Sequence, residues 1–256
     1  MAAVKVIFIG VVSVYVLGAF LLYVLQRNLL YFPSPEYQHN LPTIELLNQQ
    51  QLLKIAVLNP GQSKAIIYFG GNAESVVFNE VPFIEHFPTH TVYLVNYRGY
   101  GGSSGEPTEL GLFSDALAIY DSVQDQHNSV SAFGRSLGSG VATYLASERD
   151  IDALALITPY DSIVSVASKR FPFYPVALLM RDKYDSVERA PKVSAKVLII
   201  MAQLDRVIPN WHSVKLQEAF SDDQVTVLNI QGADHNSVSI GLEYFPALQV
   251  FFSSRL

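Results

Sequence analysis

The distribution of hydrophobic positions divides the chain into an apolar N-terminal segment and a longer mixed segment. Val6–Leu25 holds no charged residue, and its 20 positions are apolar apart from Gly10, Ser13 and Gly18. A helix of that length rises ~30 Å, which matches the hydrocarbon core of a bilayer. The pattern therefore predicts one membrane-spanning helix over residues 6–25, and we assign residues 1–25 to an N-terminal membrane anchor.

A cleaved signal peptide is the alternative interpretation of this segment. Its apolar core would be only ~7–15 residues long and would end at a small-residue cleavage site. The run here is longer and ends at Leu25-Gln26-Arg27-Asn28, which favours an uncleaved anchor. Lys5 precedes the apolar run and Arg27 follows it, so the positive-inside rule gives little information about the orientation of the helix. We expect a cytoplasmic N-terminus and a domain on the exported, extracytoplasmic side.

We expect residues 26–50 to form a short tether between the anchor and the rest of the chain. The segment contains Tyr31-Phe32-Pro33-Ser34-Pro35, and its prolines favour extended backbone. A tether of this length would hold the following domain against the membrane.

From residue 51 to residue 256, apolar β-rich runs alternate with helix-like segments. This alternation predicts an α/β domain with a mostly parallel sheet and helices on both faces. The expected strands are Leu52–Leu58, Ala65–Phe69, Thr91–Asn96, Ser129–Phe133, Ala153–Thr158, Val197–Met201 and Val225–Ile230. Glu109–Asp125 and Leu137–Arg149 are the clearest helices. Glycine clusters follow several strands, at the sheet edge where ligands bind in such folds.

Composition excludes several classes of function. The 17 basic and 23 acidic residues give a net charge of −6, which argues against a nucleic-acid-binding protein. The absence of cysteine removes disulfides, thiolate metal sites and a cysteine nucleophile. No histidine or carboxylate cluster has ligand spacing and no dinucleotide or P-loop motif occurs, so we expect neither a metal nor a cofactor.

Gly134-Arg135-Ser136-Leu137-Gly138 follows a predicted strand and precedes a predicted helix. This is the setting that a G-x-S-x-G nucleophile elbow requires. Gly134 and Gly138 permit the tight turn, the Ser136 hydroxyl would stand at the strand tip, and the Leu137 N–H would face a developing oxyanion. A chance match in a strand-to-helix turn is the alternative.

A serine nucleophile needs a base and a carboxylate that orients it. Of the six histidines, His212 and His235 follow Ser136, as the chain order serine, acid, histidine requires. We favour His235, which lies in a glycine-containing loop after a strand. Asp205 is the expected acid because it closely follows the strand Val197–Met201; Asp161 is the competitor and Asp234 a weaker one.

The second oxyanion donor is expected in the loop after the strand Ala65–Phe69. That loop is Gly70-Gly71-Asn72-Ala73-Glu74, and the Asn72 backbone N–H is the expected donor. Gly70 and Gly71 would let the backbone approach a bound carbonyl.

Taken together, these motifs resemble the α/β-hydrolase superfamily and, within it, the membrane-anchored Bem46-like group. The resemblance runs over nearly the whole chain. The motifs that carry it are Tyr31-Phe32-Pro33, Asn96-Tyr97-Arg98-Gly99-Tyr100-Gly101 with Ser103, Gly105 and Pro107, Gly134 to Gly140, Asp205 with Val207 and Pro209, and Gly232 with His235. The resemblance implies an α/β-hydrolase fold with Ser136, Asp205 and His235 as its triad.

One departure concerns the oxyanion loop. The group usually has a histidine where this chain has Gly70. Its loss removes a side chain that braces the loop and leaves the backbone donors in place, so we expect a more mobile loop.

The expected function is that of a membrane-anchored serine hydrolase of carboxylic esters or thioesters, with lipid or acyl substrates. A serine peptidase of the same superfamily and a non-catalytic, hydrolase-like binding scaffold are the alternatives. Residues 159–190, rich in apolar side chains, form either a small lid over an acyl pocket or an ordinary crossover whose apolar face packs into the core.

Overall fold

One sheet contains all the strands expected from the sequence, together with an additional strand before them. The structure, a computed structural model, describes residues 1–253. Its strands are β1 Thr43–Asn48, β2 Gln51–Leu58, β3 Lys64–Phe69, β4 His90–Val95, β5 Ser129–Arg135, β6 Ala153–Ile157, β7 Lys196–Ala202 and β8 Val225–Ile230. Its α-helices are α1 Ala2–Leu30, α2 Glu80–His86, α3 Glu109–Val123, α4 Leu137–Glu148, α5 Ile163–Arg170, α6 Val176–Leu179, α7 Ser186–Arg189, α8 Asn210–Gln217 and α9 Tyr244–Ser253.

The strand order places a topological switch point beside β5. The eight strands run β1-β2-β4-β3-β5-β6-β7-β8. β3 to β8 are parallel neighbours, whereas β2 pairs antiparallel with both β1 and β4. The chain moves from β3 to β4 on one side and returns across β3 to β5 on the other, and ligands bind at such reversals in open α/β sheets.

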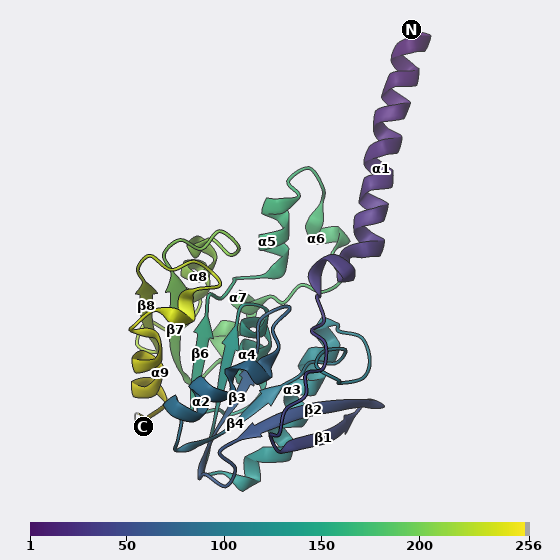
Figure 1. Cartoon of the computed structure of the whole chain (residues 1–256). Helices are drawn as coiled ribbons and strands as arrows, with labels where there is room; N and C mark the ends of the chain where they lie inside the picture. The colour runs from purple at the N-terminus through teal and green to yellow at the C-terminus, as the bar shows by residue number, and fades with distance from the viewer. Residues whose placement is uncertain (254–256) are drawn as a thin grey trace.

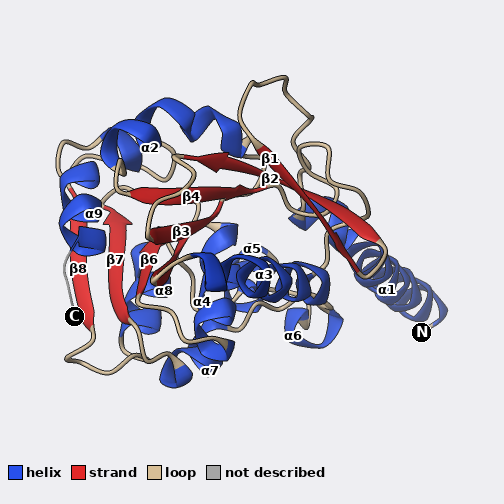
Figure 2. Ribbon diagram, turned by 90° about the horizontal axis from the view of Figure 1, so that it is seen from below, coloured by secondary structure: helices blue, strands red, loops and turns tan. Residues whose placement is uncertain are grey.

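Helices cover both faces of the sheet, as the continuous apolar runs predict (Figure 2). Alternate side chains of β3 pack into two hydrophobic cores on opposite faces of the sheet. Ile67 and Phe69 belong to the core beneath α3 and α4, and Ile66 and Tyr68 belong to the core beneath α2 and α9. Each central strand is therefore buried on both sides, which explains its unbroken Val/Ile/Leu sequence.

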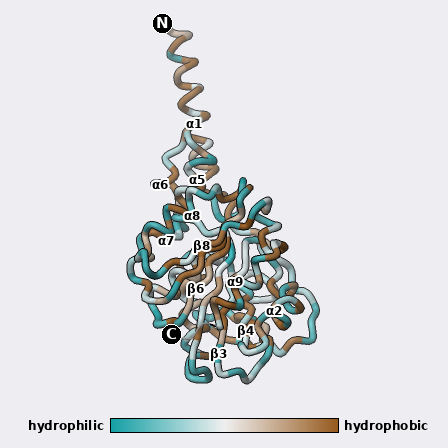
Figure 3. Tube along the Cα trace, turned by 90° about the vertical axis from the view of Figure 1, so that its left-hand side faces the viewer, coloured by the Kyte–Doolittle hydropathy of each residue, from teal (hydrophilic) through white to brown (hydrophobic). Residues whose placement is uncertain are grey.

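Helix α1 projects away from the domain (Figure 1) and is brown over most of its length in the hydropathy view (Figure 3). None of its residues is buried. It is the only helix in residues 1–253 that is long and apolar enough to cross a membrane. The carboxyl ends of β5 to β8 point to the same side of the molecule as α1 (Figure 1).

The structure corrects the expected tether at both of its ends. Residues 26–30 continue α1, so the helix extends beyond the apolar run. Thr43–Asn48 is strand β1 at the sheet edge, which places these residues inside the domain. Only residues 31–42 connect the two, and they lie in extended or irregular backbone.

Candidate active site

Ser136 is the single residue between β5 and α4, at the switch point of the sheet. Its backbone has φ 50° and ψ −116°, a left-handed conformation that costs roughly 1–3 kcal/mol for a residue with a side chain. A side chain on Gly134 would collide with the Gly138 carbonyl, and one on Gly138 would collide with the Phe69 carbonyl. The two glycines therefore permit the sharp turn that presents the serine.

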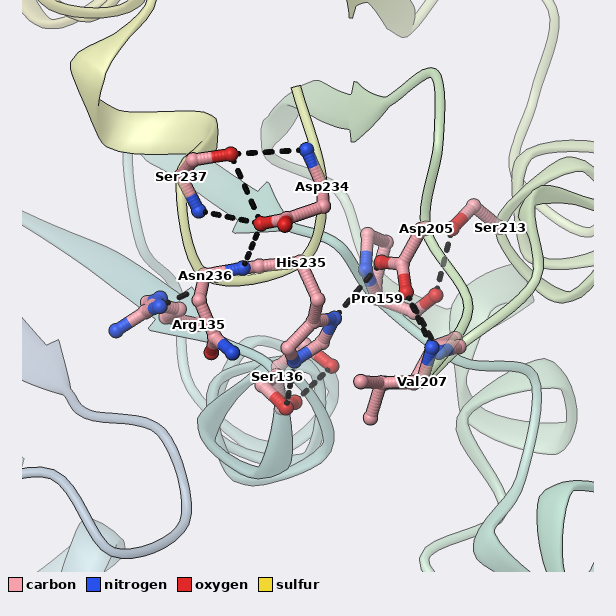
Figure 4. Close-up of polar contacts among 12 residues, drawn as sticks. Arg135, Ser136, Pro159, Asp205, Val207, Ser213, Asp234, His235, Asn236 and Ser237 are labelled. Carbon is pink, nitrogen blue, oxygen red and sulfur yellow. Dashed lines mark hydrogen bonds and ion pairs between the residues drawn. The ribbon is translucent and has the colours of Figure 1, made fainter. Parts of the chain in front are cut away.

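The structure brings Ser136, His235 and Asp205 into one hydrogen-bonded chain (Figure 4). His235 Nε2 lies 2.9 Å from Ser136 Oγ, and His235 Nδ1 lies 2.7 Å from Asp205 Oδ2. The Asp205 and His235 side chains are buried. This is the geometry in which a carboxylate orients an imidazole toward a hydroxyl.

Backbone hydrogen bonds hold the acid and base loops in place. Asp205 Oδ1 accepts the N–H groups of Val207 and Ile208 at 2.9 and 2.8 Å, which leaves Oδ2 free for His235. The Leu204 N–H donates to the Ala233 carbonyl at 2.8 Å and so joins the loop after β7 to the loop after β8. The carboxylate and the imidazole are thus fixed relative to each other.

The other candidate acids and the other histidine lie in separate interactions. Asp161 accepts from His212 Nδ1 at 2.6 Å and from Lys215 Nζ at 2.8 Å. Burial works to raise the pKa of Asp161, yet the hydrogen bonds from His212 and Lys215 outweigh it and hold that pKa below its ordinary value. Asp234 instead turns its own loop, because its carboxylate accepts from Ser237 Oγ and from the Asn236 and Ser237 N–H groups.

The loop after β3 lies beside the elbow, as the oxyanion assignment requires. A Cβ built on Gly71 would stand 3.7 Å from Ser136 Cβ. The Leu137 N–H belongs to the first turn of α4, where backbone donors have no partner within the helix. Asn72 and Leu137 as backbone donors to an oxyanion stay a prediction.

Glu74 is the residue that sequence reasoning missed. One carboxylate oxygen accepts from Tyr68 Oη and Asn79 Nδ2 at 2.6 and 2.7 Å, and the other accepts from the Gly71 N–H at 2.7 Å and Arg135 Nη1 at 3.0 Å. Glu74 therefore joins the loop after β3 to Arg135, the residue before Ser136. The available signal was its spacing, since a glutamate three residues after a turn residue often reaches back to that residue's N–H.

Two tyrosines of the Asn96-Tyr97-Arg98-Gly99-Tyr100-Gly101 motif hold the same loop from the opposite side. Tyr97 Oη donates to the Gly70 carbonyl at 2.7 Å, and Tyr100 Oη donates to Asn72 Oδ1 at 2.9 Å. Burial raises the pKa of both hydroxyls, so both remain protonated donors at neutral pH.

These contacts bear on the expectation of a mobile loop. A side chain at Gly70 would collide with Val76 and crowd Glu74, so this loop conformation has no space for a histidine. The loop is braced by Glu74, Tyr97 and Tyr100 instead. Glycine at position 70 is therefore no reason to expect a mobile loop after β3.

Within residues 1–253, no three histidine or carboxylate side chains are grouped so that they could hold a metal ion.

Comparison with known proteins places this geometry in context. A family model described as alpha/beta hydrolase fold matches residues 64–179. An uncharacterised protein of Mycobacterium tuberculosis is 32% identical over 227 residues, which cover 82% of this chain and 80% of that protein. An alpha/beta hydrolase domain-containing protein of Caenorhabditis elegans is 31% identical over 164 residues, 62% of this chain and 48% of that protein. An esterase of Pyrococcus furiosus superposes with a TM-score of 0.70 at 16% identity and covers 86% of this chain and 98% of its own, a similarity of fold.

Proposed function

Because the chain has the α/β-hydrolase fold, we propose that it is a serine hydrolase that cleaves carboxylic ester or thioester bonds through an acyl-enzyme on Ser136. The observation that carries the proposal is the hydrogen-bonded chain from Asp205 through His235 to the strained elbow serine. The esterase neighbour supports the fold, and the site supports the chemistry.

Each residue has a distinct role in this mechanism. His235 Nε2 takes the proton of Ser136 as Oγ attacks the substrate carbonyl, and His235 then gives that proton to the departing alcohol or thiol. Asp205 holds the imidazole in the required tautomer and stabilises its protonated form. A water molecule, deprotonated by His235, then attacks the acyl-enzyme and regenerates Ser136.

Two backbone donors complete the proposed site. The N–H groups of Asn72 and Leu137 stabilise the negative charge that forms on the carbonyl oxygen. The hydrogen bonds of Gly71 with Glu74 and of Gly70 with Tyr97 support this role, because they fix the loop before substrate arrives.

The N-terminal helix is the proposed membrane anchor, with residues 6–25 in the bilayer and the domain on the exported side. Its length, its composition and the absence of buried residues support this role. We also place the chain in the Bem46-like group. The contacts of Tyr97 and Tyr100 at the site support that placement, because they give the group's Asn-Tyr-Arg-Gly-Tyr-Gly motif a physical role.

The test uses an active-site probe together with an ester assay. We expect the full-length protein in detergent to react with a fluorophosphonate probe and to hydrolyse p-nitrophenyl butanoate. Ser136→Ala removes the nucleophile and should lower kcat by a factor of about 10⁴ or more. Ser147→Ala is the matched control, because Ser147 lies near the other end of α4 and its hydroxyl donates only within that helix, to the Tyr144 carbonyl. Equal labelling of the Ser136→Ala protein would refute the mechanism.

A further inference from the structure

An apolar cavity of about 230 Å³ lies between α1 and the α5–α6 segment. Its walls are Leu22, Leu29 and Leu30 on α1, and residues such as Val166, Ala167 and Leu179 on the other side. The volume is somewhat below the ~300–1,000 Å³ of pockets that enclose whole small molecules. An apolar space of this size suits part of a ligand, such as one hydrocarbon chain.

The α5–α6 segment is attached to α1 over a considerable length. The ring of Tyr15 stacks on that of Tyr174 at 5.0 Å, and its hydroxyl donates to the Phe173 carbonyl at 2.9 Å. Gln26 Nε2 donates to the Leu179 carbonyl at 3.1 Å, and the Arg27 guanidinium lies 2.8 Å from Asp182. From residue 15 to residue 27 the helix rises ~18 Å, so both structures extend side by side (Figure 1).

This attachment brings the tip of the segment to the level of the bilayer. Tyr15 lies ten residues before Leu25, the end of the uncharged run, which corresponds to ~15 Å along the helix. The segment beside it exposes Phe173 and Leu178, which are 84% and 85% accessible. Large apolar side chains exposed beside a membrane-spanning helix are expected where the surrounding solvent is lipid.

The charged residues of the segment fit a position at the membrane boundary. The Arg181 guanidinium lies 4.2 Å from the ring centre of Tyr23, and Tyr and Arg side chains are both common at the headgroup level. Lys169 and Arg170 end α5. The Lys169 ammonium lies 5.5 Å from the ring centre of Trp211 on α8, whereas Arg170 lines the cavity, and its long stem lets its charge reach the headgroups. The cavity wall from Leu22 to Leu30 therefore begins at this boundary and continues into the domain.

One residue that lines the inner end of the cavity, Leu30, is hydrogen-bonded to the loop beside the proposed site. No triad side chain lines the cavity. However, the Leu30 carbonyl accepts from Asn72 Nδ2 at 2.6 Å, and Asn72 belongs to the loop that contacts the elbow. The cavity thus leads from the headgroup level toward the loop beside Ser136.

We propose that this cavity binds one hydrocarbon chain of a bilayer lipid, which enters sideways between α1 and α5–α6. The proposal rests on the proposed function and deepens it, since it makes long-chain acyl esters of the membrane the substrate class. The membrane helix then serves as one wall of the substrate site as well as an anchor.

The first test compares chain lengths in two matched variants of the full-length protein. Ala167→Trp places a large ring in the cavity, whereas Ala177→Trp makes the same change at an exposed position of α6 outside the cavity. We expect Ala167→Trp to lower kcat/KM for p-nitrophenyl hexadecanoate roughly tenfold or more, because several methylene groups lose their burial. The ratio of this kcat/KM to that for p-nitrophenyl butanoate should fall by a similar factor, and Ala177→Trp should keep the ratio of the unsubstituted protein.

The second test requires no turnover and no substitution among the residues that line the cavity. The Ser136→Ala protein in dioleoylphosphatidylcholine vesicles is irradiated with a diazirine-labelled hexadecanoic acid, and the cross-linked peptides are mapped by mass spectrometry. We expect adducts on both walls, in residues 22–30 and 163–180. Labelling of α1 without labelling of the facing α5–α6 wall would overturn the proposal.

The two tests separate this proposal from the proposed function. Adducts on both walls with no turnover of any ester would refute the hydrolase mechanism and keep the chain-binding site. Turnover whose chain-length profile is the same in the unsubstituted and Ala167→Trp proteins would refute the chain-binding site and keep the hydrolase mechanism.

Discussion

At the candidate site, Ser136 has a strained backbone, and charged side chains next to it hold the neighbouring loop in place. Ser136 keeps a left-handed backbone because Gly134 and Gly138 leave room for the turn. Glu74 contacts the Gly71 N–H on one side and Arg135, the residue before the serine, on the other. Because its carboxylate is largely buried, these charge-assisted hydrogen bonds are stronger than exposed ones would be.

Glu74→Gln tests this positioning role at the residue scale. The amide has one acceptor oxygen, so it cannot serve the Gly71 N–H and Arg135 at one end and the donors Tyr68 Oη and Asn79 Nδ2 at the other, as the carboxylate does. The loop therefore loses its fixed position relative to Ser136. We expect kcat for p-nitrophenyl butanoate to fall about tenfold or more, with little change in KM, because the loss concerns the transition state. Steady-state kinetics on the full-length protein measure the split between kcat and KM.

Glu85→Gln is the control for that variant, since Glu85 is an exposed carboxylate on α2. It should leave both constants unchanged. Thermal unfolding of the two variants separates a local effect from a loss of folded protein. A Glu74→Gln enzyme with normal kcat would show that the loop is held by Tyr97 and Tyr100 alone.

Single elements show where sequence patterns identify structure and where they fail. Strands β3 to β8 were predicted with boundaries accurate to about two residues. For β3, β4, β6 and β7 the signal was a continuous apolar run, which marks a strand buried on both faces. Strand β1 was missed. It pairs only with β2, only every second side chain is partly buried, and the turn at Gln49 and Gln50 has positive φ values without the glycine that usually marks such a hairpin.

The contacts between α1 and α5–α6 were not predictable for a different reason. The sequence of each segment has a local interpretation of its own: an anchor for α1, and a lid or crossover for α5–α6. Their hydrogen bonds join residues about 155 positions apart, such as Gln26 and Arg181. No periodicity in a single sequence encodes such a pairing.

Asp161→Asn tests, at the element scale, how α5 and α8 are joined to the end of β6. The carboxylate of Asp161 is fully buried and accepts from His212 and Lys215 on α8. The amide leaves these donors less well paired, so we expect a loss of roughly 1–3 kcal/mol in the free energy of unfolding at pH 7. Urea unfolding of the detergent-solubilised protein, followed by circular dichroism, measures this loss.

The pH dependence of this loss follows from the lowered pKa of Asp161 in the folded state. Below the ordinary aspartate pKa of ~3.9 the unfolded chain binds a proton that the folded chain does not, so the stability supplied by Asp161 is lost as pH falls. The difference between the unsubstituted protein and Asp161→Asn should narrow between about pH 5 and pH 2. Asp121→Asn removes an exposed pair with Arg149 and should cost under ~1 kcal/mol at any pH; a constant gap for Asp161→Asn would contradict the assignment.

At the scale of the whole molecule, the end of the apolar helix contacts the sheet edge that holds the candidate site. Asn72 Nδ2 donates to the Leu30 carbonyl at 2.6 Å, and Asn72 Oδ1 accepts from the Phe32 N–H at 3.0 Å. One side chain therefore binds the last turn of α1 while its own backbone forms the proposed oxyanion loop. The sheet edge with the triad faces the side from which α1 projects (Figure 1), so the anchor would hold that edge toward the membrane.

Asn72→Ala keeps the backbone N–H and removes the side-chain contacts with the Leu30 carbonyl, the Phe32 N–H and Tyr100. Tyr100→Phe removes the Tyr100 hydrogen bond and keeps the Leu30 contact, so the difference between the two variants measures the role of the helix end. If the helix end helps to hold the loop, kcat for a soluble short-chain ester in detergent should fall about tenfold, although such a substrate needs no membrane. Asn40→Ala is the matched control, at an exposed position of the segment 31–42 that connects α1 to the domain. It should leave kcat unchanged. Limited proteolysis within residues 31–42 should become faster in Asn72→Ala only, because that segment loses its attachment. Normal kcat together with faster proteolysis would mean that the helix end is held by the loop without supporting catalysis, and would reduce the role of α1 to anchoring and to the wall of the acyl cavity.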